Sequence, residues 1–440
     1  MWGRKRMIVS FSELTRVFAR IGCLSFGGPA GQIALMHREL VEERGWIEEG
    51  QYLRALNFCH LLPGPEAQQL ATFIGWRLAG TAGGLIAGLL FVIPGALVML
   101  ALSFAYVVAA GTAWFDGLFL GIKAAVLAIV VQAVLRVAGR ALKGPGQVAL
   151  AIAAFVALAL FNMPFPLVVL GAGLIGLLFM SGSGHATTDS APSTTSTATL
   201  VLQTLRTLAI WLAIWAAPAV LIVATLGPDH ILFTIATFFS QLAVVTFGGA
   251  YAVLSYMAQE AVQTYGWLAP NEMADGLGLA ETTPGPLIMV TQFVGFLGAW
   301  RAPEPFSPWM AGLLGAGVTT WMTFAPCFLF IFTLAPWIER LERAKRLQSG
   351  LAALTAAVVG VIANLALWFA LHVLFGSVVR VEAGPVDVSV PVLASIDWIA
   401  LAIALLALVL AFRMKLGTLP LLAICAAAGL IATQATALTP

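Results

Sequence analysis

Apolar residues run along this chain in long blocks that are separated by short polar segments. The long stretches without Asp, Glu, Lys or Arg cover residues 78–115, 144–188, 207–228, 230–259, 282–300, 305–338, 347–379 and 416–440. About 20 apolar residues cross the hydrocarbon core of a bilayer. The longer stretches therefore hold more than one crossing, broken at Pro94, Pro164 or Pro326. This pattern predicts an all-α, polytopic helical membrane protein.

Composition agrees with a membrane protein and excludes several other classes. Of the 440 residues, 60% are hydrophobic and only 10% are charged, whereas soluble domains carry about 25% charge. A water-soluble enzyme, a disordered chain and a disulfide scaffold are therefore excluded. The net charge of +2 is too small for nucleic-acid binding. The four cysteines form no CxxC pair, so we expect no metal site and no cofactor.

A polar linker divides the chain into two halves. Residues 181–199 read SGSGHATTDSAPSTTSTAT, in which Ser and Thr predominate, and such a segment is typical of a flexible linker. We expect an N-terminal half over 1–180 and a C-terminal half over 200–440, and the C-terminal half begins with an extra span at about 205–226. The basic start, with no cleavage site after it, predicts an uncleaved chain with a cytoplasmic N-terminus.

The two halves share a repeated sequence. SFGGPAGQIALMHRELVEERGW at residues 25–46 resembles TFGGAYAVLSYMAQEAVQTYGW at residues 246–267, at an offset of 221. The same offset carries the Pro-Gly-Pro at 63–65 onto that at 284–286, and 13 of the 48 positions across 18–65 are identical. Convergent apolar composition is the alternative, but it does not readily place Phe-Gly-Gly, Gly-Trp and Pro-Gly-Pro at one spacing. Matched interruptions in two membrane halves are typical of secondary transporters.

The extra span before the rear repeat predicts how the halves are oriented. One additional crossing reverses an otherwise identical half, so we expect inverted repeats with broken helices, related by a pseudo-two-fold axis. The number of crossings stays open, because residues 12–41 and 48–78 each fit either a broken span or a re-entrant hairpin.

The breaks are the expected substrate-binding site. Proline ends a helix because it lacks an N–H and clashes with the preceding turn, and the second proline of Pro-Gly-Pro suits the first position of the next helix. Free N–H groups at that new N-terminus favour an anion by about 0.3–1 kcal/mol, and by up to about 2 kcal/mol when partly buried. Packing kinks are the alternative interpretation. The candidate substrate-binding residues lie in or beside the breaks: Ser25, Phe26, Gly27, Gly28, Gln32, Pro63, Gly64, Pro65, Glu66, Gln68, Gln69, Thr246, Phe247, Gly248, Gly249, Glu281, Thr282, Thr283, Pro284, Gly285, Pro286 and Gln292.

Several of these side chains allow two interpretations. Ser25 and Thr246 are repeat partners, and each hydroxyl either donates to an oxyanion or bonds a carbonyl of its own helix. Glu66 follows the front Pro-Gly-Pro; it is either a functional acid in the membrane or a first-turn carboxylate that balances the helix dipole. The candidate cationic or coupling residues are Arg20, His60, Arg77 and Lys123, with snorkelling to the interface as the favoured interpretation of Arg77.

These motifs resemble the chromate ion transporter (CHR) family of the long, two-domain type. The segments that carry the resemblance are SFGGPAGQIALM, LLPGPEAQQLATFIGW and AETTPGPLIMVTQFVGFLGAW, and the match covers roughly residues 11–140 and 230–372. The resemblance implies a bacterial inner-membrane exporter of chromate that confers resistance, with sulfate as a structural analogue. It also implies fused halves of opposite orientation. It identifies no coordinating residues.

We therefore expect a secondary active transporter that exports chromate, driven by the membrane potential or coupled to proton entry. Another oxyanion such as sulfate is the alternative substrate, and a channel-like anion pathway is the alternative mechanism. A membrane-embedded oxyanion-processing enzyme is the alternative of a different class, but the sequence has no metal-ligand set, haem His pair or nucleotide motif. The expected partners are the oxyanion and the lipid bilayer, without nucleic acid; a homodimer is the assembly to test.

Overall fold

The chain folds into two compact units. The computed structural model describes residues 9–179, 197–247 and 249–438. Unit 1 comprises Met1–Val98, Phe179–Ala250 and Pro284–Leu351, and unit 2 comprises Met99–Leu178, Tyr251–Thr283 and Ala352–Pro440. Each unit thus contains segments that precede the predicted linker and segments that follow it. Most of that linker, and the basic residues at the N-terminus, lie outside the described residues.

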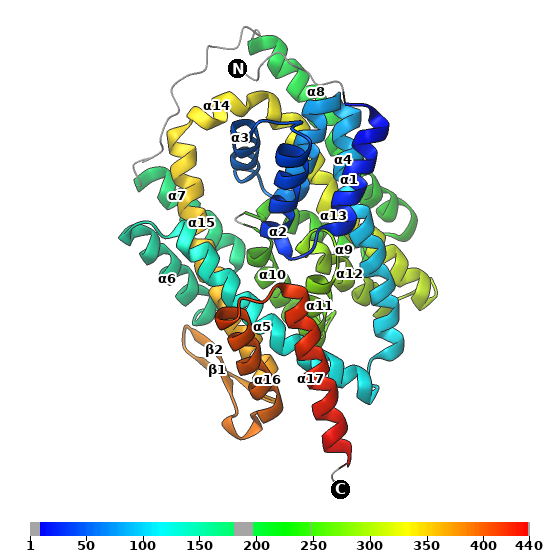
Figure 1. The fold of residues 1–440 in the computed structure, drawn as a ribbon, viewed down its shortest axis with the longest axis vertical. Helices are drawn as coiled ribbons and strands as arrows, with labels where there is room; N and C mark the ends of the chain where they lie inside the picture. Colours follow the sequence, from blue (N-terminus) through cyan, green and yellow to red (C-terminus); the bar gives the residue numbers. More distant parts are fainter. Residues whose placement is uncertain (1–8, 180–196, 248, 439–440) are drawn as a thin grey trace. The chain divides into compact units, whose positions relative to one another are not determined.

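Unit 1 is built from helices of both halves (Figure 1). They are α1 (Phe11–Leu24), α2 (Gly28–His37), the π-helix η1 (Arg38–Glu43), α3 (Glu49–Cys59), most of α4 (Glu66–Ala109), α8 (Thr197–Leu226), α9 (Ile231–Val245), the short 3-10 helix η3 (Leu287–Met289), α12 (Val290–Arg301), α13 (Pro308–Leu334), η4 (Ala335–Trp337), α14 (Ile338–Arg343) and the start of α15 (Lys345–Leu374).

Unit 2 contains the remaining helices and one β-hairpin. Its elements are the end of α4, α5 (Ala113–Ala141), α6 (Pro145–Ala159), α7 (Phe165–Phe179), α10 (Ala250–Gln259), the π-helix η2 (Glu260–Thr264), α11 (Pro270–Thr282), most of α15, β1 (Val378–Ala383), β2 (Val386–Pro391), η5 (Leu393–Ser395), α16 (Trp398–Leu408), the π-helix η6 (Val409–Arg413) and α17 (Thr418–Leu438).

The predicted all-α, polytopic membrane architecture is confirmed. In the described part of the chain, six helices are long and apolar enough to cross a bilayer: Glu66–Ala109, Ala113–Ala141, Thr199–Leu226, Pro308–Trp337, Arg346–Leu374 and Thr418–Ala435. Large apolar side chains on their outer faces, such as Leu97 and Val220, are more than half exposed. Such exposed apolar surface is expected of helices that face lipid rather than water.

The backbone repeats at the offset found in the sequence. Adding 221 to the bounds of α1, α2, η1 and α3 reproduces those of α9, α10, η2 and α11 to within two residues. A π-helix therefore interrupts both halves at the same point, and a glycine in the left-handed conformation follows each, at Gly45 (φ 58°) and Gly266 (φ 60°). These matched boundaries support a structural repeat in addition to the sequence repeat.

A second interruption follows each Pro-Gly-Pro. In α4 the backbone leaves the helical conformation at Ala79 and Gly80, and residues 302–307 separate α12 from α13 at the corresponding place. The arm between Pro-Gly-Pro and Ala79 is about 20 Å long at 1.5 Å per residue, too short to cross the hydrocarbon core of about 30 Å. The two segments of α4 on either side of this interruption pack closely, because a Cβ on Gly83 would lie 2.4 Å from the carbonyl oxygen of Gly75.

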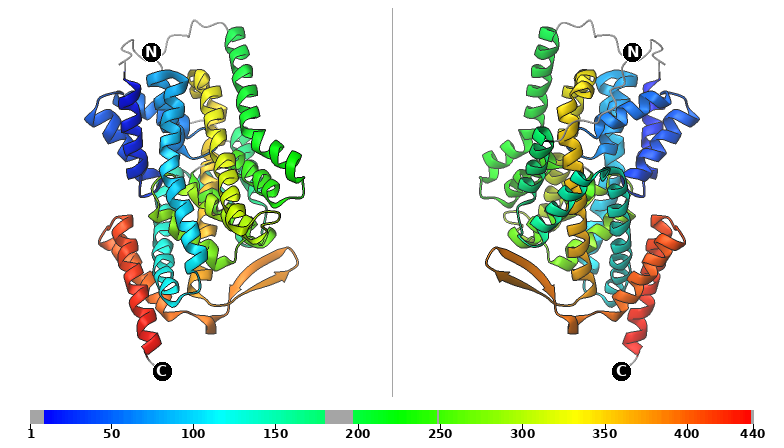
Figure 2. Two further views of the ribbon diagram at one scale, coloured as in Figure 1. Left: turned by 90° about the vertical axis from the view of Figure 1, so that its right-hand side faces the viewer. Right: turned by 90° about the vertical axis from the view of Figure 1, so that its left-hand side faces the viewer.

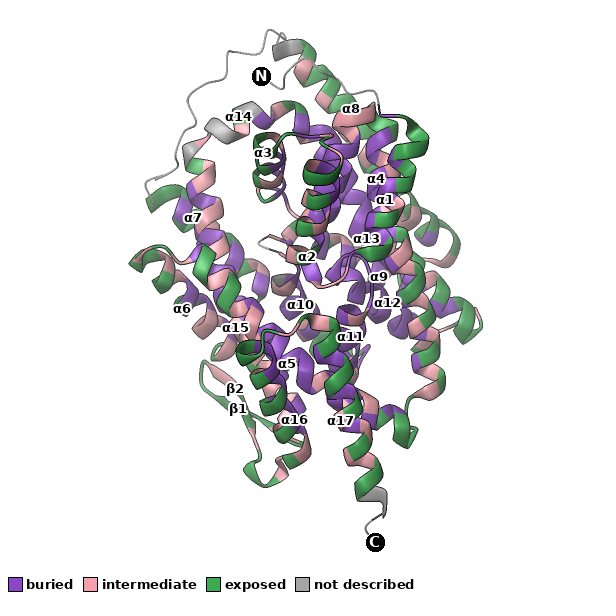
Figure 3. Ribbon diagram, viewed as in Figure 1, coloured by how far each residue is buried: buried purple, intermediate pink, exposed green. Residues whose placement is uncertain are grey.

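One core joins both halves within unit 1. Buried side chains of α1 to α4, among them Phe18, Phe58 and Phe91, pack in one cluster with Phe328 and Ile331 of α13. In unit 2, α5 is the central helix, and about half of its residues are buried, including the unbroken run from Ala124 to Val130 (Figure 3). Helices α11, α16 and α17 pack against it.

Small residues allow α5 and α17 to approach closely. Gly117 and Gly121 stand four residues apart on α5, and a Cβ on Gly121 would lie 1.9 Å from the carbonyl oxygen of Cys425 on α17. Such glycine-lined contacts are the usual way in which membrane helices pack tightly.

The β-hairpin is an element that the sequence analysis did not predict. Strands β1 and β2 pair in antiparallel register, from Val378 opposite Pro391 to Ala383 opposite Val386, and the hairpin projects beyond the neighbouring helices of unit 2 (Figure 2). The signal was present in the alternating sequence VVRVEA-GP-VDVSVP, whose Gly384 takes the positive φ of a tight turn.

Candidate functional site

Two hydrogen bonds cross between the front and rear breaks in unit 1. The backbone N–H of Gly285 donates to the carbonyl oxygen of Ser25 over 2.8 Å, and the N–H of Gly64 donates to that of Thr246, also over 2.8 Å. Ser25 and Thr246 are repeat partners, as are Gly64 and Gly285. Each Phe-Gly-Gly break therefore pairs with the Pro-Gly-Pro break of the other half, as a pseudo-two-fold relation requires.

Glycine is needed at these breaks because the backbone is left-handed there. The values of φ are 83° at Gly27, 69° at Gly28, 114° at Gly64, 100° at Gly249 and 89° at Gly285. Side chains strongly disfavour such angles. The remaining glycine of the motif, Gly248, lies outside the described residues.

The second proline of each Pro-Gly-Pro lies one position before the helix, not at its first residue as expected. Helix α4 begins at Glu66, and the rear helical segment begins with η3 at Leu287. Pro65 and Pro286 thus precede the first helical residues instead of occupying that position. Pro-Gly-Pro still separates α3 from α4 and α11 from α12, as predicted.

The hydroxyls of Ser25 and Thr246 bond their own helices. Ser25 Oγ donates to the carbonyl oxygen of Ile21 over 2.6 Å, and Thr246 Oγ1 donates to that of Leu242. Both side chains are fully buried. In this conformation their hydrogens are engaged, so donation to a substrate requires that these bonds exchange.

Glutamine side chains of the front half donate hydrogen bonds to backbone carbonyls in both Pro-Gly-Pro breaks. The Gln32 side chain donates to the carbonyl oxygen of Gly285, and Gln69 donates to that of Pro63. Gln68 and Gln292 are also buried. In the described part of the chain, the side-chain oxygens of Gln68, Gln69 and Gln292 have no hydrogen-bond partner. Buried amides in this state keep hydrogen-bonding capacity beside the breaks.

Helix α4 packs directly on the rear break. A Cβ on Gly95 would lie 2.3 Å from the carbonyl oxygen of Pro284. At the front break, a Cβ on Gly64 would lie 2.9 Å from Nε2 of Gln69 and 3.1 Å from Sγ of Cys327. Gly95 and Cys327 are not recognisable as neighbours of the breaks from the sequence, because only the tertiary fold brings them there.

The candidate acids fall in different places. Glu66 lies in the first turn of α4, and its Oε2 is 3.1 Å from Nε2 of His60 across the front break. Glu281 accepts a hydrogen bond of 2.9 Å from the hydroxyl of Tyr251. Glu281, Thr282 and Thr283 belong to unit 2, whereas the breaks belong to unit 1. The hydroxyls of both threonines donate to the carbonyl oxygen of Leu279.

The candidate cations are likewise divided between the two units, with Arg20 and Arg77 in unit 1 and Lys123 in unit 2. Arg20 lies 3.4 Å from buried Glu39, which also pairs with Arg44, and the guanidinium of Arg77 lies over the ring of Trp76. Lys123 pairs with Asp275 in unit 2 over 3.2 Å. Asp275 was missed, although an acid among apolar residues in a membrane chain is itself a signal of function.

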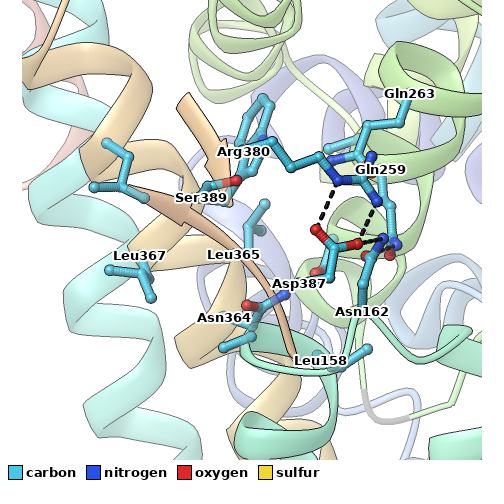
Figure 4. A pocket seen from close by; sticks show the side chains of 15 residues that line it. Leu158, Asn162, Gln259, Gln263, Asn364, Leu365, Leu367, Arg380, Asp387 and Ser389 are labelled. Atoms are coloured by element: carbon cyan, nitrogen blue, oxygen red, sulfur yellow. Dashed lines mark hydrogen bonds and ion pairs between the residues drawn. The ribbon is translucent and has the colours of Figure 1, made fainter. Parts of the chain in front are cut away.

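A small polar cavity of about 90 Å³ lies in unit 2 beside the hairpin (Figure 4). Asp387 of β2 accepts hydrogen bonds from Arg380 Nε over 2.6 Å and from Asn162 Nδ2 over 3.1 Å. Gln259 donates in turn to Asn162. The predicted substrate-binding residues do not line this cavity.

Comparison with known proteins decides the family. A sequence model described as chromate transporter matches residues 12–177 and 233–431, most of the chain. The chain belongs to the chromate transporter family. The two matched segments lie on either side of the predicted linker and of α8.

Curated relatives agree with this assignment. The chain is 33% identical to a chromate transport protein of Pseudomonas aeruginosa, over 80% of each chain. It is 29% identical to a probable chromate transport protein of Synechococcus elongatus, over 81% of this chain and 83% of the relative. Identity to a chromate transport protein of Cupriavidus metallidurans is 27%, over 80% of each chain. No solved structure matches significantly. The family places this chain among membrane transporters, not enzymes.

Proposed function

We propose that this protein is a secondary active transporter that exports chromate across the bacterial inner membrane. Two fused repeats, 1–180 and 200–440, form the transporter, and the four breaks form its anion-binding site. The observation that carries the proposal is the pair of crossed hydrogen bonds, which brings the breaks of both halves together in unit 1.

The crossed bonds suggest how an oxyanion is held. Backbone amides of Gly64 and Gly285 point at carbonyl oxygens, and a carbonyl oxygen is a weaker acceptor than an ionised oxyanion. Charge-assisted hydrogen bonds are about twice as strong as neutral ones. Chromate oxygens are therefore proposed to replace the carbonyls of Ser25 and Thr246 when the breaks part. Because the contacts are direct in the present conformation, substrate entry requires this separation.

Membrane energetics favour export. Chromate is a dianion near neutral pH, and each charge that crosses the field is worth about 2.3 kcal/mol per 100 mV. A potential that is negative inside thus favours exit of the dianion by about 4.6 kcal/mol per 100 mV. Proton entry in exchange would add to this driving force, whereas uptake would require co-transported cations.

Loop charges support opposite orientations of the two repeats. The front segment 38–54 carries Arg38, Arg44 and Arg54, whereas the matched rear segment 259–275 has no Lys or Arg. Cytoplasmic loops are enriched in such residues. Within unit 1, α3 and α14, with Arg54 and Arg340, lie towards the same end (Figure 1). We propose that this end, and the N-terminus, are cytoplasmic.

Sulfate is the main alternative substrate, because it shares the tetrahedral shape and double charge of chromate. A channel-like pathway is the alternative mechanism, and saturation at low flux with counter-transport would argue against it.

Transport in sealed inside-out vesicles tests the proposal. We expect chromate accumulation that rises with an interior-positive potential and falls when excess sulfate competes. A pH gradient imposed at zero potential separates proton coupling from potential-driven movement. Absence of chromate accumulation under every gradient, in vesicles that contain the folded protein, would refute the proposed function.

A further inference from the structure

Unit 2 contains a buried charged cluster that the break site does not use. Nζ of Lys123 lies 3.2 Å from Oδ1 of Asp275, and the hydroxyl of Tyr106 donates to Oδ2 of Asp275 over 2.9 Å. The three side chains come from α5, α11 and the end of α4. Asp275 is 6% exposed and Tyr106 is 5% exposed. Three separate elements thus meet at one carboxylate.

The cluster lies deep along a membrane-spanning helix. Lys123 is ten residues from the start of α5, which corresponds to about 15 Å of helix, or half of a hydrocarbon core of about 30 Å. Charges at that depth are expensive and are functional candidates by default. Pairing with Asp275 keeps the cluster neutral while it stays in place.

Lys123 is the more accessible member of the pair. Its side chain is 19% exposed and that of Asp275 is 8% exposed. An ammonium group has three N–H donors, and the ion pair with Asp275 occupies at most one of them. The lysine therefore has donors left for a second acceptor, while the carboxylate is held by two partners.

The packed elements of the cluster carry few other charged groups, and on α5 these are Asp116, Arg136 and Arg140. Glu272 shares α11 with Asp275, and Glu281 stands at the far end of that helix. Helix α17, which packs on α5 and α11, has no acidic or basic residue, and neither has α16. Phe115 and Phe119 pack edge-on against Tyr106. Among these segments, Lys123 is thus the cation that faces Asp275.

We propose that Lys123 is a separate binding point for the transported oxyanion within unit 2, and that Asp275 is the internal anion that the substrate displaces there. This inference rests on the proposed function. Without substrate, Asp275 pairs with Lys123, so no bare charge is buried. When an oxyanion arrives, its oxygens accept the N–H groups of Lys123, and the hydroxyl of Tyr106 continues to stabilise the released carboxylate. Asp275 is then a competitor whose removal strengthens anion binding.

Opposite effects of the two partners on chromate affinity are the signature of displacement. Chromate and sulfate binding to the purified full-length protein are measured by calorimetry, separately from transport. Asp275→Asn is expected to tighten chromate binding and slow its release, and Lys123→Gln to weaken binding about ten-fold or more, the range of a lost charged hydrogen bond. Lys123→Arg keeps the charge and is expected to bind within a few-fold of wild type.

A purely structural ion pair predicts a different result. Both single neutralisations would then impair the protein alike, and the double variant Lys123→Gln, Asp275→Asn would recover wild-type binding. Under the proposal, the double variant folds but binds chromate about ten-fold more weakly than wild type. The chromate affinity of the double variant distinguishes displacement from a structural ion pair even if the single variant Asp275→Asn fails to accumulate. Wild-type binding by the double variant overturns the inference, whereas missing transport by the wild-type protein overturns the proposed function instead.

Discussion

At the scale of single residues, backbone groups rather than side chains join the candidate site. The amides of Gly64 and Gly285 make the crossed contacts, and the adjoining hydroxyls of Ser25 and Thr246 bond their own helices. The local requirement is thus for glycine, whose left-handed conformation aims the amide at the opposite break.

Alanine at the Pro-Gly-Pro glycines is expected to reduce chromate export by at least ten-fold. At φ values of 114° for Gly64 and 89° for Gly285, a side chain costs about 1–3 kcal/mol of strain. At Gly64 the new Cβ also meets Gln69 and Cys327. Initial rates in vesicles, normalised to the amount of folded protein, measure the effect.

Gly80→Ala and Gly139→Ala are the matched controls. Gly80 has a φ of 68° with open space around it, and Gly139 is a helical glycine with nothing within 4 Å. Both should export at near wild-type rates. If Gly80→Ala is as damaging as Gly64→Ala, backbone strain alone explains the loss and the breaks have no special role.

Removal of the two hydroxyls is expected to have little effect. Ser25→Ala and Thr246→Val each lose a local bond worth about 0.5–1.5 kcal/mol, but they keep the carbonyl that accepts the crossed bond. We expect the KM for chromate to change less than about three-fold. A hundred-fold rise in KM at normal protein levels would instead identify the hydroxyls as substrate donors.

At the scale of elements, the same interruptions recur in both halves while the additions differ. Phe-Gly-Gly, the π-helix and Pro-Gly-Pro recur at one offset. Helix α8 and the β-hairpin are additions to the rear half. The hairpin is fastened by Asp387, which accepts from Arg380 and Asn162 and whose own N–H donates to the carbonyl oxygen of Leu160.

The hairpin should loosen on acidification. Hydrogen bonds from Arg380 hold the pKa of Asp387 below its usual value. A carboxylate with a lowered pKa stabilises the folded state above its unfolded pKa of about 3.9, and this stabilisation is lost as the pH falls through the folded pKa. Protection of 378–391 against hydrogen exchange, measured relative to the intrinsic exchange rate at each pH, should therefore be high at neutral pH and should fall in that acidic range.

Asp387→Asn provides the control for this pH effect. The amide cannot titrate, so exchange of the hairpin should already be fast at neutral pH and should vary little with acidification beyond the intrinsic rate. A hairpin that stays protected in the variant would show that Asp387 does not fasten it.

At the scale of the whole molecule, compact units and sequence halves are different divisions. Unit 1 contains the breaks of both halves, and unit 2 contains Lys123 from the front half with Asp275 from the rear half. Neither half therefore contains a complete candidate site, and we expect transport to require both.

Labelling of matched cysteines tests the inverted arrangement. Glu42 and Gln263 are repeat partners, and both are exposed. In a Cys23→Ser background, which removes the exposed native cysteine, an impermeant thiol reagent should label Gln263→Cys in intact cells. Glu42→Cys should react only after the membrane is opened. Reaction of both from one side would refute inverted repeats.

The sequence by itself determined the class and the breaks at Phe-Gly-Gly and Pro-Gly-Pro. The breaks expected at Pro94 and Pro326 were wrong, because these prolines lie inside helices α4 and α13, and α4 is interrupted at Ala79 and Gly80 instead. Apolar length, Pro-Gly-Pro and Phe-Gly-Gly act through the backbone within a few residues, so their effects are visible without a fold. The repeat was visible because 221 residues separate identical motifs.

Only the tertiary structure decided which groups meet. Gly285 bonds Ser25, and Asp275 pairs with Lys123, across more than 150 residues of sequence. No local propensity specifies such partners, because buried polar groups accept whichever partner the packing of distant helices brings within reach.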